Sequence, residues 1–348
     1  MPLPANPNIA IVGATGAVGR ELITILNERA FRHTSLRLLA SARSAGSTIE
    51  HAGSPQTVQE LTEASFEGID LAFFSAGASV SETFAPIAVK QGAVVIDNSS
   101  AFRMDENVPL VVPEINGSVL DNFDIPGAGV IAVPNCSAIV ALMAITPLHR
   151  AVGIERMVIS TYQAASGAGA AWMAELEQQA HDHVAGRPYT MDVLGRQYLF
   201  NLFSHNSAIG ANGYNFEESK VIAETHKIWN DDLVRVTVTC IRVPVLRAHC
   251  LSINLTFRES MNEDQAREIL DNAPGVKLVD DREANKFPEP IDAAGQDDVL
   301  VGRIRSDISQ PPGKGLELFV AGDQLRKGAA LNAVQIAEYL MRTPARTV

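Results

Sequence analysis

The chain has 348 residues, of which 46% are hydrophobic and 20% are charged, and its formal net charge is −12. These values indicate a globular protein long enough for two domains of roughly 150 residues each, and no apolar stretch approaches the roughly 20 residues that span a bilayer. The acidic balance argues against a general nucleic-acid-binding surface, so an anionic ligand would need specifically placed arginine and lysine side chains.

The cysteines and the N-terminus favour a cytosolic protein. Cys136, Cys240 and Cys250 form an odd set without a CxxC pair, which predicts neither a disulfide framework nor a zinc site. The first residues lack a basic segment followed by a long apolar core, so no secretory signal is predicted. A thiol therefore remains available for chemistry.

The first predicted elements are a buried strand over residues 8–12, the glycine turn GATGAVG over 13–19 and a helix with apolar residues at Val18, Leu22, Ile25 and Leu26. This order is what a dinucleotide pyrophosphate site requires, because the backbone must approach the phosphates and the helix N-terminus supplies N–H donors. The alternative is a glycine turn that serves tight packing only.

The second predicted strand, residues 36–40, ends in Ser41, Ala42, Arg43 and Ser44. A site for NAD usually carries a carboxylate here to bind the ribose. Hydroxyls and a guanidinium instead suit a ribose 2′-phosphate, because arginine offers a planar fork to phosphate oxygens. This loop favours NADP over NAD, with a solvated polar loop as the alternative.

Further strands at 69–75 and 93–97 enclose a helix from about 79 to 90, and this alternation predicts a parallel, doubly wound sheet. The polar loop 98–103 then follows a strand at its carboxyl end, where ligands of such sheets bind. Arg103 is therefore a candidate anion ligand. The alternative for Arg103 is a surface salt bridge.

Cys136 lies where a short apolar run and a proline give way to a helical pattern, in the stretch AVPNCSAIV over 132–140. A cysteine in the first turn of a helix faces backbone N–H groups and the positive end of the helix dipole, which favour the thiolate. The same N–H groups could hold an oxyanion. The alternative is a small buried hydrophobic residue.

After Cys136 the pattern changes to that of a second, α+β domain with a mostly antiparallel sheet. Its predicted strands cover 157–163, 233–241, 248–257, 299–305 and 316–321, with a helix over 170–184. A last amphipathic helix, residues 325–341, carries apolar Leu331, Val334, Ala337 and Leu340 and is expected to return to the nucleotide domain.

Eight segments in order resemble the aspartate-semialdehyde dehydrogenase family. They are GATGAVG (13–19), SARSAG (41–46), DNSSAFR (97–103), VPNCSAIV (133–140), TYQAASGAG (161–169), FEESK (216–220), IRVPVLRAH (241–249) and GDQLRKGAALNAVQIAE (322–338). The family is similar in fold to the phosphorylating glyceraldehyde-3-phosphate dehydrogenases. The resemblance implies a Rossmann-type NADP-binding domain over 1–134, with the C-terminal helix 325–348 packed on it, and an α+β catalytic and dimerisation domain over 135–324.

The resemblance also implies the reaction. Aspartate 4-semialdehyde, phosphate and NADP would be interconverted with 4-aspartyl phosphate and NADPH through a cysteine thioester, in the biosynthesis of lysine, threonine, methionine and diaminopimelate. It implies a homodimer, with a tetramer as the alternative, and no metal, nucleic acid or membrane partner.

Site residues follow from the resemblance position by position. Cys136 matches the nucleophile, His249 the acid/base and Gln163 the residue that orients the substrate. Arg242 and Glu217 match the groups that bind the substrate carboxylate and amino group. The phosphate site matches Arg103, Asn135 and Lys220. Cofactor contacts match Gly13, Thr15, Gly16, Ala17, Val18, Ser41, Arg43, Ser166, Gly167 and Gln324.

Several alternatives stay open. Taken alone, His249 fits an ordinary half-buried histidine of a strand, and Glu217 with Lys220 fits a surface ion pair one helical turn apart. Ala138 departs from the family, where threonine is common, and leaves the fine positioning of the substrate or nicotinamide open. N-acetylglutamyl-phosphate reductase shares the chemistry but would carry glycine in place of Asn135. A non-catalytic paralogue would lack the thiol, the histidine or the arginines, all of which are present.

Overall fold

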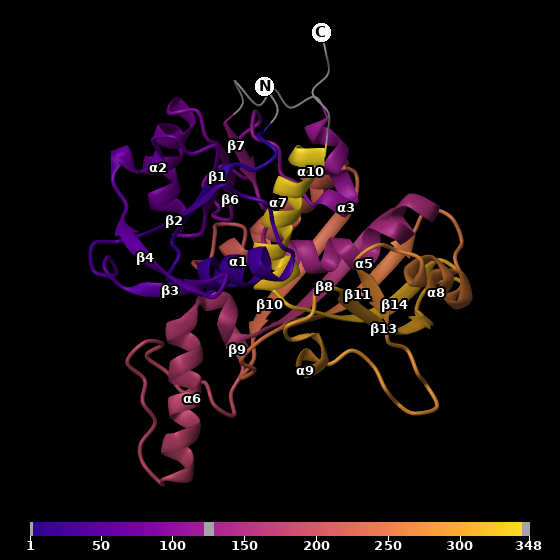
Figure 1. Cartoon of the computed structure of the whole chain (residues 1–348). Coiled ribbons are helices and arrows are strands. Elements are labelled where there is room, and N and C mark those ends of the chain that lie inside the picture. The colour runs from indigo at the N-terminus through magenta and orange to yellow at the C-terminus, as the bar shows by residue number, and fades with distance from the viewer. Residues whose placement is uncertain (1–2, 122–128, 343–348) are drawn as a thin grey trace. The chain divides into compact units, whose positions relative to one another are not determined.

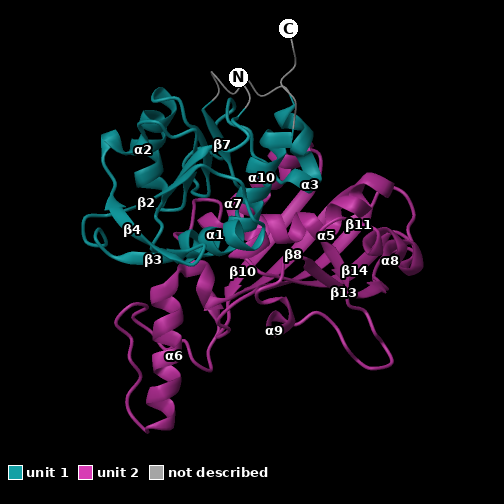
Figure 2. Ribbon diagram, in the orientation of Figure 1, with its two compact units in different colours: residues 1–135, 329–348 teal, residues 136–328 magenta. Residues whose placement is uncertain are grey.

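The computed structural model describes residues 3–121 and 129–342. The chain divides into two compact units, one of residues 1–135 and 329–348 and the other of residues 136–328 (Figure 2). The last six residues of the predicted helix 325–348 lie outside the described residues. Within the described ranges, no helix combines the length and the apolar character needed to cross a membrane.

Unit 1 is built on a seven-stranded sheet in the order β3-β4-β2-β1-β5-β6-β7 (Figure 1). All neighbouring strands pair in parallel except β3 with β4. The strands are β1 (Asn8–Val12), β2 (Ser35–Ala40), β3 (Thr48–His51), β4 (Ser54–Glu60), β5 (Leu71–Phe74), β6 (Val94–Asp97) and β7 (Val130–Ala132). The predicted doubly wound parallel sheet is thereby confirmed.

The hairpin of β3 and β4 was not expected from the sequence. β3 is only four residues long, β4 shows little alternation of buried and exposed residues, and β4 begins with Ser54, Pro55 and Gln56. The hairpin occupies the connection in which a helix would usually return the chain, and β4 then joins the edge of the sheet beside β2. Pairing of this kind depends on a distant strand, which local pattern does not reveal.

The helices of unit 1 are α1 (Ala17–Glu28), α2 (Ala78–Lys90), α3 (Pro113–Asn116) and α10 (Leu331–Arg342), with short 3₁₀ turns η1 (Glu63–Phe66) and η2 (Gly117–Leu120). Helix α10 packs against α1 and α3. Asn332 donates to the Val111 carbonyl at 2.8 Å, and Arg29 forms an ion pair with Glu338. The apolar stripe predicted for this helix is its buried face, which holds Leu331, Val334, Ala337 and Leu340.

Unit 2 holds a second seven-stranded sheet in the order β12-β13-β14-β11-β8-β10-β9. Four neighbouring pairs are antiparallel, whereas β8 with β10 and β12 with β13 are parallel. The strands are β8 (Ile154–Gln163), β9 (Phe203–Ser204), β10 (Arg235–Arg242), β11 (His249–Phe257), β12 (Val276–Leu278), β13 (Val299–Ser306) and β14 (Gly315–Gly322). The mostly antiparallel sheet expected here is confirmed.

The helices of unit 2 are α5 (Cys136–Val152), α6 (Ala170–Val184), α7 (Phe216–Trp229), α8 (Glu263–Asp271) and α9 (Pro290–Ala293), with the turn η3 (Ala165–Ala168) and the π-helical segment η4 (Arg326–Ala330). Helix α5 packs on β8, β11, β13 and β14 and touches α7 and α8. Along β8 the residues Met157, Ile159 and Thr161 are buried, whereas the residues between them are half-buried or exposed. One face of the sheet is therefore the core beneath α5.

Candidate active site

The glycine turn of unit 1 connects β1 to α1 at the carboxyl edge of the sheet. Gly13 has φ +85°, and a Cβ placed there would lie 2.9 Å from the Ser75 carbonyl carbon and oxygen. Gly19 lies against the Gly13 carbonyl and has no room for a side chain. Strand order reverses between β1 and β5, and dinucleotides bind in the crevice at such a point. The turn therefore fits a nucleotide pyrophosphate.

The other residues of unit 1 that were predicted to contact the nucleotide lie at the start of α1 and in the turn after β2. Gly16 precedes the first turn of α1, and Ala17 and Val18 open that helix. Ser41 and Arg43 are exposed in the turn that follows β2. They lie at the carboxyl end of the strand next to β1, where the adenosine ribose of a bound dinucleotide is held in this fold.

Arg103 is buried in unit 1 and is only 8% exposed, which is inconsistent with a surface salt bridge. Its Nε donates to the Val133 carbonyl at 2.9 Å and its Nη2 to the Asn98 carbonyl at 2.9 Å. These bonds hold the guanidinium beside the segment that ends in Asn135, itself 5% exposed. A buried, permanently charged guanidinium in a fixed position is a candidate group for binding an anion.

Cys136 is the first residue of α5 and is partly exposed. The prediction that this cysteine opens a helix is confirmed, which places it at the positive end of the α5 dipole. Gly328 packs beside it, since a Cβ at Gly328 would lie 3.0 Å from the Cys136 Cβ and 3.2 Å from the Gln324 Cβ. Cys240 and Cys250 are buried, and burial raises the pKa of the Cys250 thiol to about 12.

Gln163 ends β8 and links the cysteine segment to α7. Its Nε2 donates to the Ser137 hydroxyl at 2.9 Å and to Glu217 Oε1 at 3.0 Å. Both amide hydrogens are thereby used, and within the described residues Oε1 makes no hydrogen bond. A buried carbonyl oxygen in this state is an acceptor for a ligand.

Glu217 lies in the first turn of α7 and is buried, so its ion pair with Lys220 is partly buried rather than wholly at the surface. Lys220 follows one turn later, with Nζ 3.7 Å from Glu217 Oε2, and its side chain is 37% exposed. Asn215 caps the helix by accepting from the Glu218 N–H, and the Glu218 side chain accepts from the Asn215 N–H. This capping box fixes the start of α7 and therefore the direction of Glu217.

Arg242 ends β10 directly opposite Gln163 in the register of the two strands. It is 4% exposed, and its Nη1 donates to the Ala164 carbonyl at 3.1 Å. Its Nη2 donates to His205 Nε2 at 2.7 Å, and its guanidinium carbon lies 5.3 Å from the centre of the Trp172 ring. Nε has no hydrogen-bond partner in the described chain.

His249 begins β11 and is fully buried, rather than half-buried as an ordinary strand histidine would be. Its Nδ1 accepts from the Ala164 N–H at 3.0 Å, which places the ring proton on Nε2. Burial first, and then the Arg242 guanidinium, lowers the pKa of His249 from 6.5 to about 3. The resemblance implied an acid/base at this position, and in the structure the imidazole is neutral near neutral pH with its Nε2–H as a donor.

Gly167 brings these groups together. A Cβ at this position would lie 2.8 Å from His249 Cε1, 2.9 Å from His249 Nε2 and 3.2 Å from Arg242 Nη1. Gln324 connects the neighbouring segments, because its Oε1 accepts from the Ala248 N–H at 3.0 Å and its Nε2 donates to the Ser166 hydroxyl. The predicted cofactor residues Ser166, Gly167 and Gln324 therefore adjoin the predicted reacting residues.

Three buried polar atoms without partners in the described residues share this site, namely Gln163 Oε1, Arg242 Nε and His249 Nε2. Such atoms are costly to bury unless a ligand satisfies them. Gln163 Oε1 is an acceptor, Arg242 Nε belongs to a cation and His249 Nε2 is a neutral donor. The arrangement suits a small ligand that carries an amino group, a carboxylate and a polarised oxygen.

Comparison with known proteins agrees with this chemistry. Residues 8–123 match the family described as semialdehyde dehydrogenase, NAD binding domain, and residues 145–327 match semialdehyde dehydrogenase, dimerisation domain. The chain is 51% identical to the aspartate-semialdehyde dehydrogenase of Synechocystis over 97% of this chain and 98% of that protein. A crystal structure of aspartate semialdehyde dehydrogenase II from Vibrio cholerae, complexed with ASA, superposes with a TM-score of 0.92 at 43% identity, covering 97% of this chain and 98% of that one.

The chain belongs to the aspartate-semialdehyde dehydrogenase family. Unit 1 accordingly carries the nicotinamide-nucleotide domain of that family, and unit 2 carries its dimerisation domain. The predicted phosphate set is divided between the units, with Arg103 and Asn135 in unit 1 and Lys220 in unit 2.

Three contacts of this family's reaction site were missed by sequence reasoning. Ser137 holds Gln163, His205 holds Arg242, and the Trp172 ring lies beside the same guanidinium. The position of Ser137 next to Cys136 could have suggested a role. His205 and Trp172 lie in segments without a periodic pattern that points at Arg242, so only the fold reveals them.

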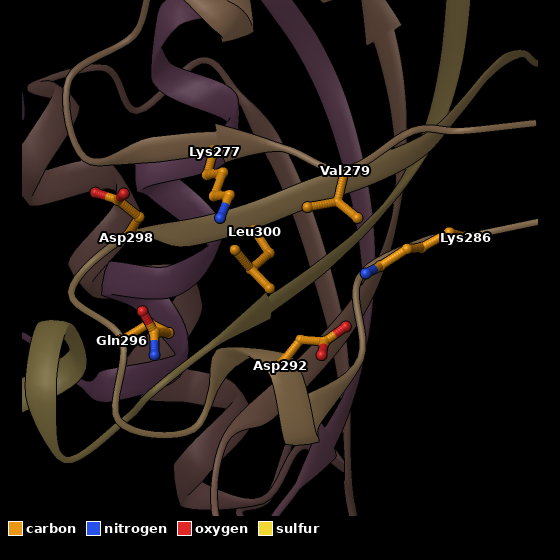
Figure 3. Close-up of a pocket in the computed structure, with 7 residues that line it drawn as sticks. All are labelled: Lys277, Val279, Lys286, Asp292, Gln296, Asp298 and Leu300. Atoms are coloured by element: carbon orange, nitrogen blue, oxygen red, sulfur yellow. The ribbon is translucent and has the colours of Figure 1, made fainter. Parts of the chain in front are cut away.

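A separate pocket of about 440 Å³ lies at the far edge of the unit 2 sheet and contains none of the predicted site residues (Figure 3). Its floor is Leu300, and its polar rim includes Lys277, Lys286, Asp292 and Asp298. These four side chains are exposed, and their formal charges cancel. The reaction site described above is therefore the candidate for catalysis.

Proposed function

We propose that this protein converts L-aspartate 4-semialdehyde, phosphate and NADP to L-4-aspartyl phosphate and NADPH, and catalyses the reverse reaction in biosynthesis. The observation that supports this most is the convergence in unit 2 of Gln163, Arg242 and His249, each with an unsatisfied buried polar atom, in the same unit as a cysteine that opens a helix. Family membership supports the same reaction.

Recognition of the substrate follows from charge. Arg242 supplies a fixed cation for the α-carboxylate, and its planar fork matches a carboxylate. Glu217 and the carbonyl oxygen of Gln163 offer acceptors to the ammonium group. These contacts would hold the aldehyde carbon at the Cys136 sulfur, and such positioning is a large part of catalysis by proximity.

In the first step the Cys136 thiolate adds to the aldehyde carbon. A C–S bond forms, and the electron pair of the carbonyl moves to its oxygen. We assign the Nε2–H of His249 to this oxyanion, since it is a donor in place before the reaction. His249 then acts as a neutral hydrogen-bond donor, because its Nδ1 is already occupied by the Ala164 N–H.

The cofactor, when bound, would supply the hydride acceptor for the carbon attached to Cys136, and that carbon would be left as a thioester. The glycine turn of unit 1 fits the pyrophosphate, and Ser41 with Arg43 would bind the 2′-phosphate, which selects NADP over NAD. Ser166, Gly167 and Gln324 would contact the nicotinamide end of the cofactor.

Phosphate completes the reaction by attacking the thioester carbon, so that an O–C bond forms and the thiolate leaves. We assign Arg103, Asn135 and Lys220 to the phosphate, because fixed cations hold an anionic nucleophile in line and stabilise it against water. Arg103 supports this role, since it is buried and two carbonyls fix the position of its guanidinium.

We also propose that the active form is a homodimer in the cytosol, where the thiol stays reduced. The sheet face opposite α5 carries Tyr162, 38% exposed, with its ring 6.1 Å from that of Phe319. Partly exposed aromatic residues of this kind are typical of interfaces. Light scattering would give about twice the 37.3 kDa chain mass for a dimer.

The reaction is tested by mixing the purified protein with aspartate semialdehyde, phosphate and NADP and following NADPH absorbance. Sulfate in place of phosphate should stop steady turnover, because the thioester is then not released. N-acetylglutamate semialdehyde should react far more slowly. Absence of NADPH formation would overturn the proposal, and a preference for the acetylated substrate would favour the sister enzyme.

A further inference from the structure

The surroundings of Arg242 are unusual for a buried cation. The three groups described against its guanidinium are the Ala164 carbonyl, the His205 imidazole and the Trp172 ring. None of these three groups carries a negative charge, and arginine stays protonated in proteins. Neutral partners fix the guanidinium while leaving its charge for a ligand, because a carboxylate partner would compete with a substrate carboxylate for the same N–H groups.

His205 is the closest of these partners, with Nε2 2.7 Å from Arg242 Nη2. Arginine has donors only, so Nε2 must accept, and the proton of a neutral imidazole then lies on Nδ1. Nδ1 faces the Ser207 hydroxyl at 3.1 Å. The Ser207 N–H also lies 3.2 Å from Nδ1, a contact that would suit the opposite tautomer. The bond from Arg242 is shorter and charge-assisted, so we assign the tautomer with its proton on Nδ1.

The protonation state of His205 agrees with this geometry. Burial, and next the positive charge of Arg242, lowers the pKa of His205 from 6.5 to about 4 against an opposing effect of Glu217. The imidazole is therefore neutral near neutral pH and can accept from Arg242.

His205 is itself held from two sides. Its backbone N–H donates to the Cys240 carbonyl at 2.8 Å, two residues before Arg242 on β10. Beyond its ring, the Ser207 hydroxyl accepts from the Glu217 N–H at 3.1 Å and donates to Asn215 at 3.3 Å. One line of hydrogen bonds thus runs from the N-terminus of α7, where Glu217 lies, through His205 to Arg242.

We propose that His205 is a positioning residue for substrate recognition. It orients the Arg242 guanidinium toward the substrate α-carboxylate and fixes the position of the guanidinium relative to Glu217. The inference rests on the proposed function, since the role of Arg242 is part of that proposal. Loss of the acceptor on His205 would weaken binding of a substrate that has the carboxylate. The chemical step at Cys136 would be affected much less, because His205 touches none of the reacting groups.

The test compares His205→Leu, which fills space but cannot accept, with His205→Gln, whose amide oxygen can. Each variant is assayed with aspartate semialdehyde and with 3-aminopropanal, which lacks the carboxylate. His205→Leu should raise KM for aspartate semialdehyde roughly tenfold or more and change kcat by less than about threefold. His205→Gln should return KM to within about threefold of the native value, and kcat/KM for 3-aminopropanal should stay nearly constant in both variants.

The matched control is His181→Ala, an exposed histidine of α6, which should change none of these constants. Should His205→Leu fail to fold by circular dichroism, His205→Asn replaces it, because the shorter amide cannot reach Nη2. An unchanged KM, or an equal loss of kcat/KM for both aldehydes without rescue by glutamine, would overturn the inference while the proposed function stands. Absence of turnover in the native protein would instead overturn the proposed function, and the inference with it.

Discussion

The reaction site of unit 2 and the nucleotide turn of unit 1 use opposite means to bind charged ligands. In unit 2, the charged or polar side chains of Gln163, Glu217, Arg242 and His249 are all buried and connected by hydrogen bonds. In unit 1 the proposed nucleotide contacts are the backbone turn after β1 and the exposed side chains of Ser41 and Arg43.

The difference shows how each site tolerates change. A buried network of polar groups holds its members within a narrow geometry, and the loss of one member leaves others unsatisfied. An exposed loop contributes weaker, separable contacts, because solvent competes for each of them. Substitutions of these buried residues in unit 2 should therefore lower the rate strongly. Substitutions in the exposed loop of unit 1 should have a smaller effect, limited to binding of the nucleotide.

The largest effect is expected for Cys136→Ala. Turnover should fall by on the order of 10⁴-fold or more, because no other group of the site can form the thioester. Binding of NADPH, followed by fluorescence titration, should stay unchanged, since the glycine turn lies in the other unit. Cys136→Ser is the matched variant that keeps the size of the side chain. Substantial activity in the alanine variant would rule out covalent catalysis.

Gly167→Ala tests the close packing of the reaction site. The added methyl group would lie within 3 Å of His249 Nε2, so the imidazole must move. A displacement of about 1 Å should cost roughly 10²-fold in kcat/KM. The melting temperature, measured on the same sample, shows whether the fold is retained. A fully active, folded alanine variant would mean that His249 does not act from the position described.

The pH dependence of stability reports two histidines whose pKa is lowered, half-buried His205 and fully buried His249. Below pH 6.5 the unfolded chain gains a proton on His205 that the folded chain cannot accept until about pH 4, so the free energy of unfolding falls as pH falls. From pH 7.5 to pH 5 this histidine should remove about 2 kcal/mol. Urea unfolding of native protein and His205→Gln at both pH values measures the difference, and an identical pH dependence in the two proteins would contradict it. His249 should act in the same direction, since its pKa is lowered to about 3.

The smallest effect is expected in the exposed loop. Arg43→Ala should raise KM for NADP about tenfold, because a charge-assisted contact to the 2′-phosphate is lost. KM for NAD, which lacks that phosphate, should change by less than about twofold. Arg43→Lys keeps the charge, so its KM for NADP should lie between that of the native protein and that of Arg43→Ala. Equal effects on both cofactors would mean that the 2′-phosphate is bound elsewhere.

Much of the fold could be predicted from local pattern. The run at 8–12 is β1, the helix predicted over 170–184 is α6, and the cysteine at 136 opens α5. The hairpin of β3 and β4 could not be predicted, because its strands are short and polar and are held by pairing with β2. The role of His205 could not be predicted either, since thirty-seven residues separate it from Arg242.

The tautomer of His249 could not be predicted from the sequence either. The resemblance implied that His249 is the acid/base, but it gave neither the tautomer nor the burial of the ring. Complete burial and the Ala164 N–H at Nδ1 make the ring a neutral donor. Neither the burial of His249 nor its hydrogen bond to a backbone N–H eighty-five residues away can be predicted from the local sequence pattern.

By itself, the sequence determined the strand and helix order, the glycine turn, the reactive cysteine at a helix start and the family, because these depend on neighbouring residues and on motifs that are contiguous. Only the tertiary structure decided which side chains surround Arg242, which nitrogen of His249 carries the proton, and which polar atoms remain for a ligand. Those properties arise from burial and from hydrogen bonds between strand ends and loops that are far apart along the chain.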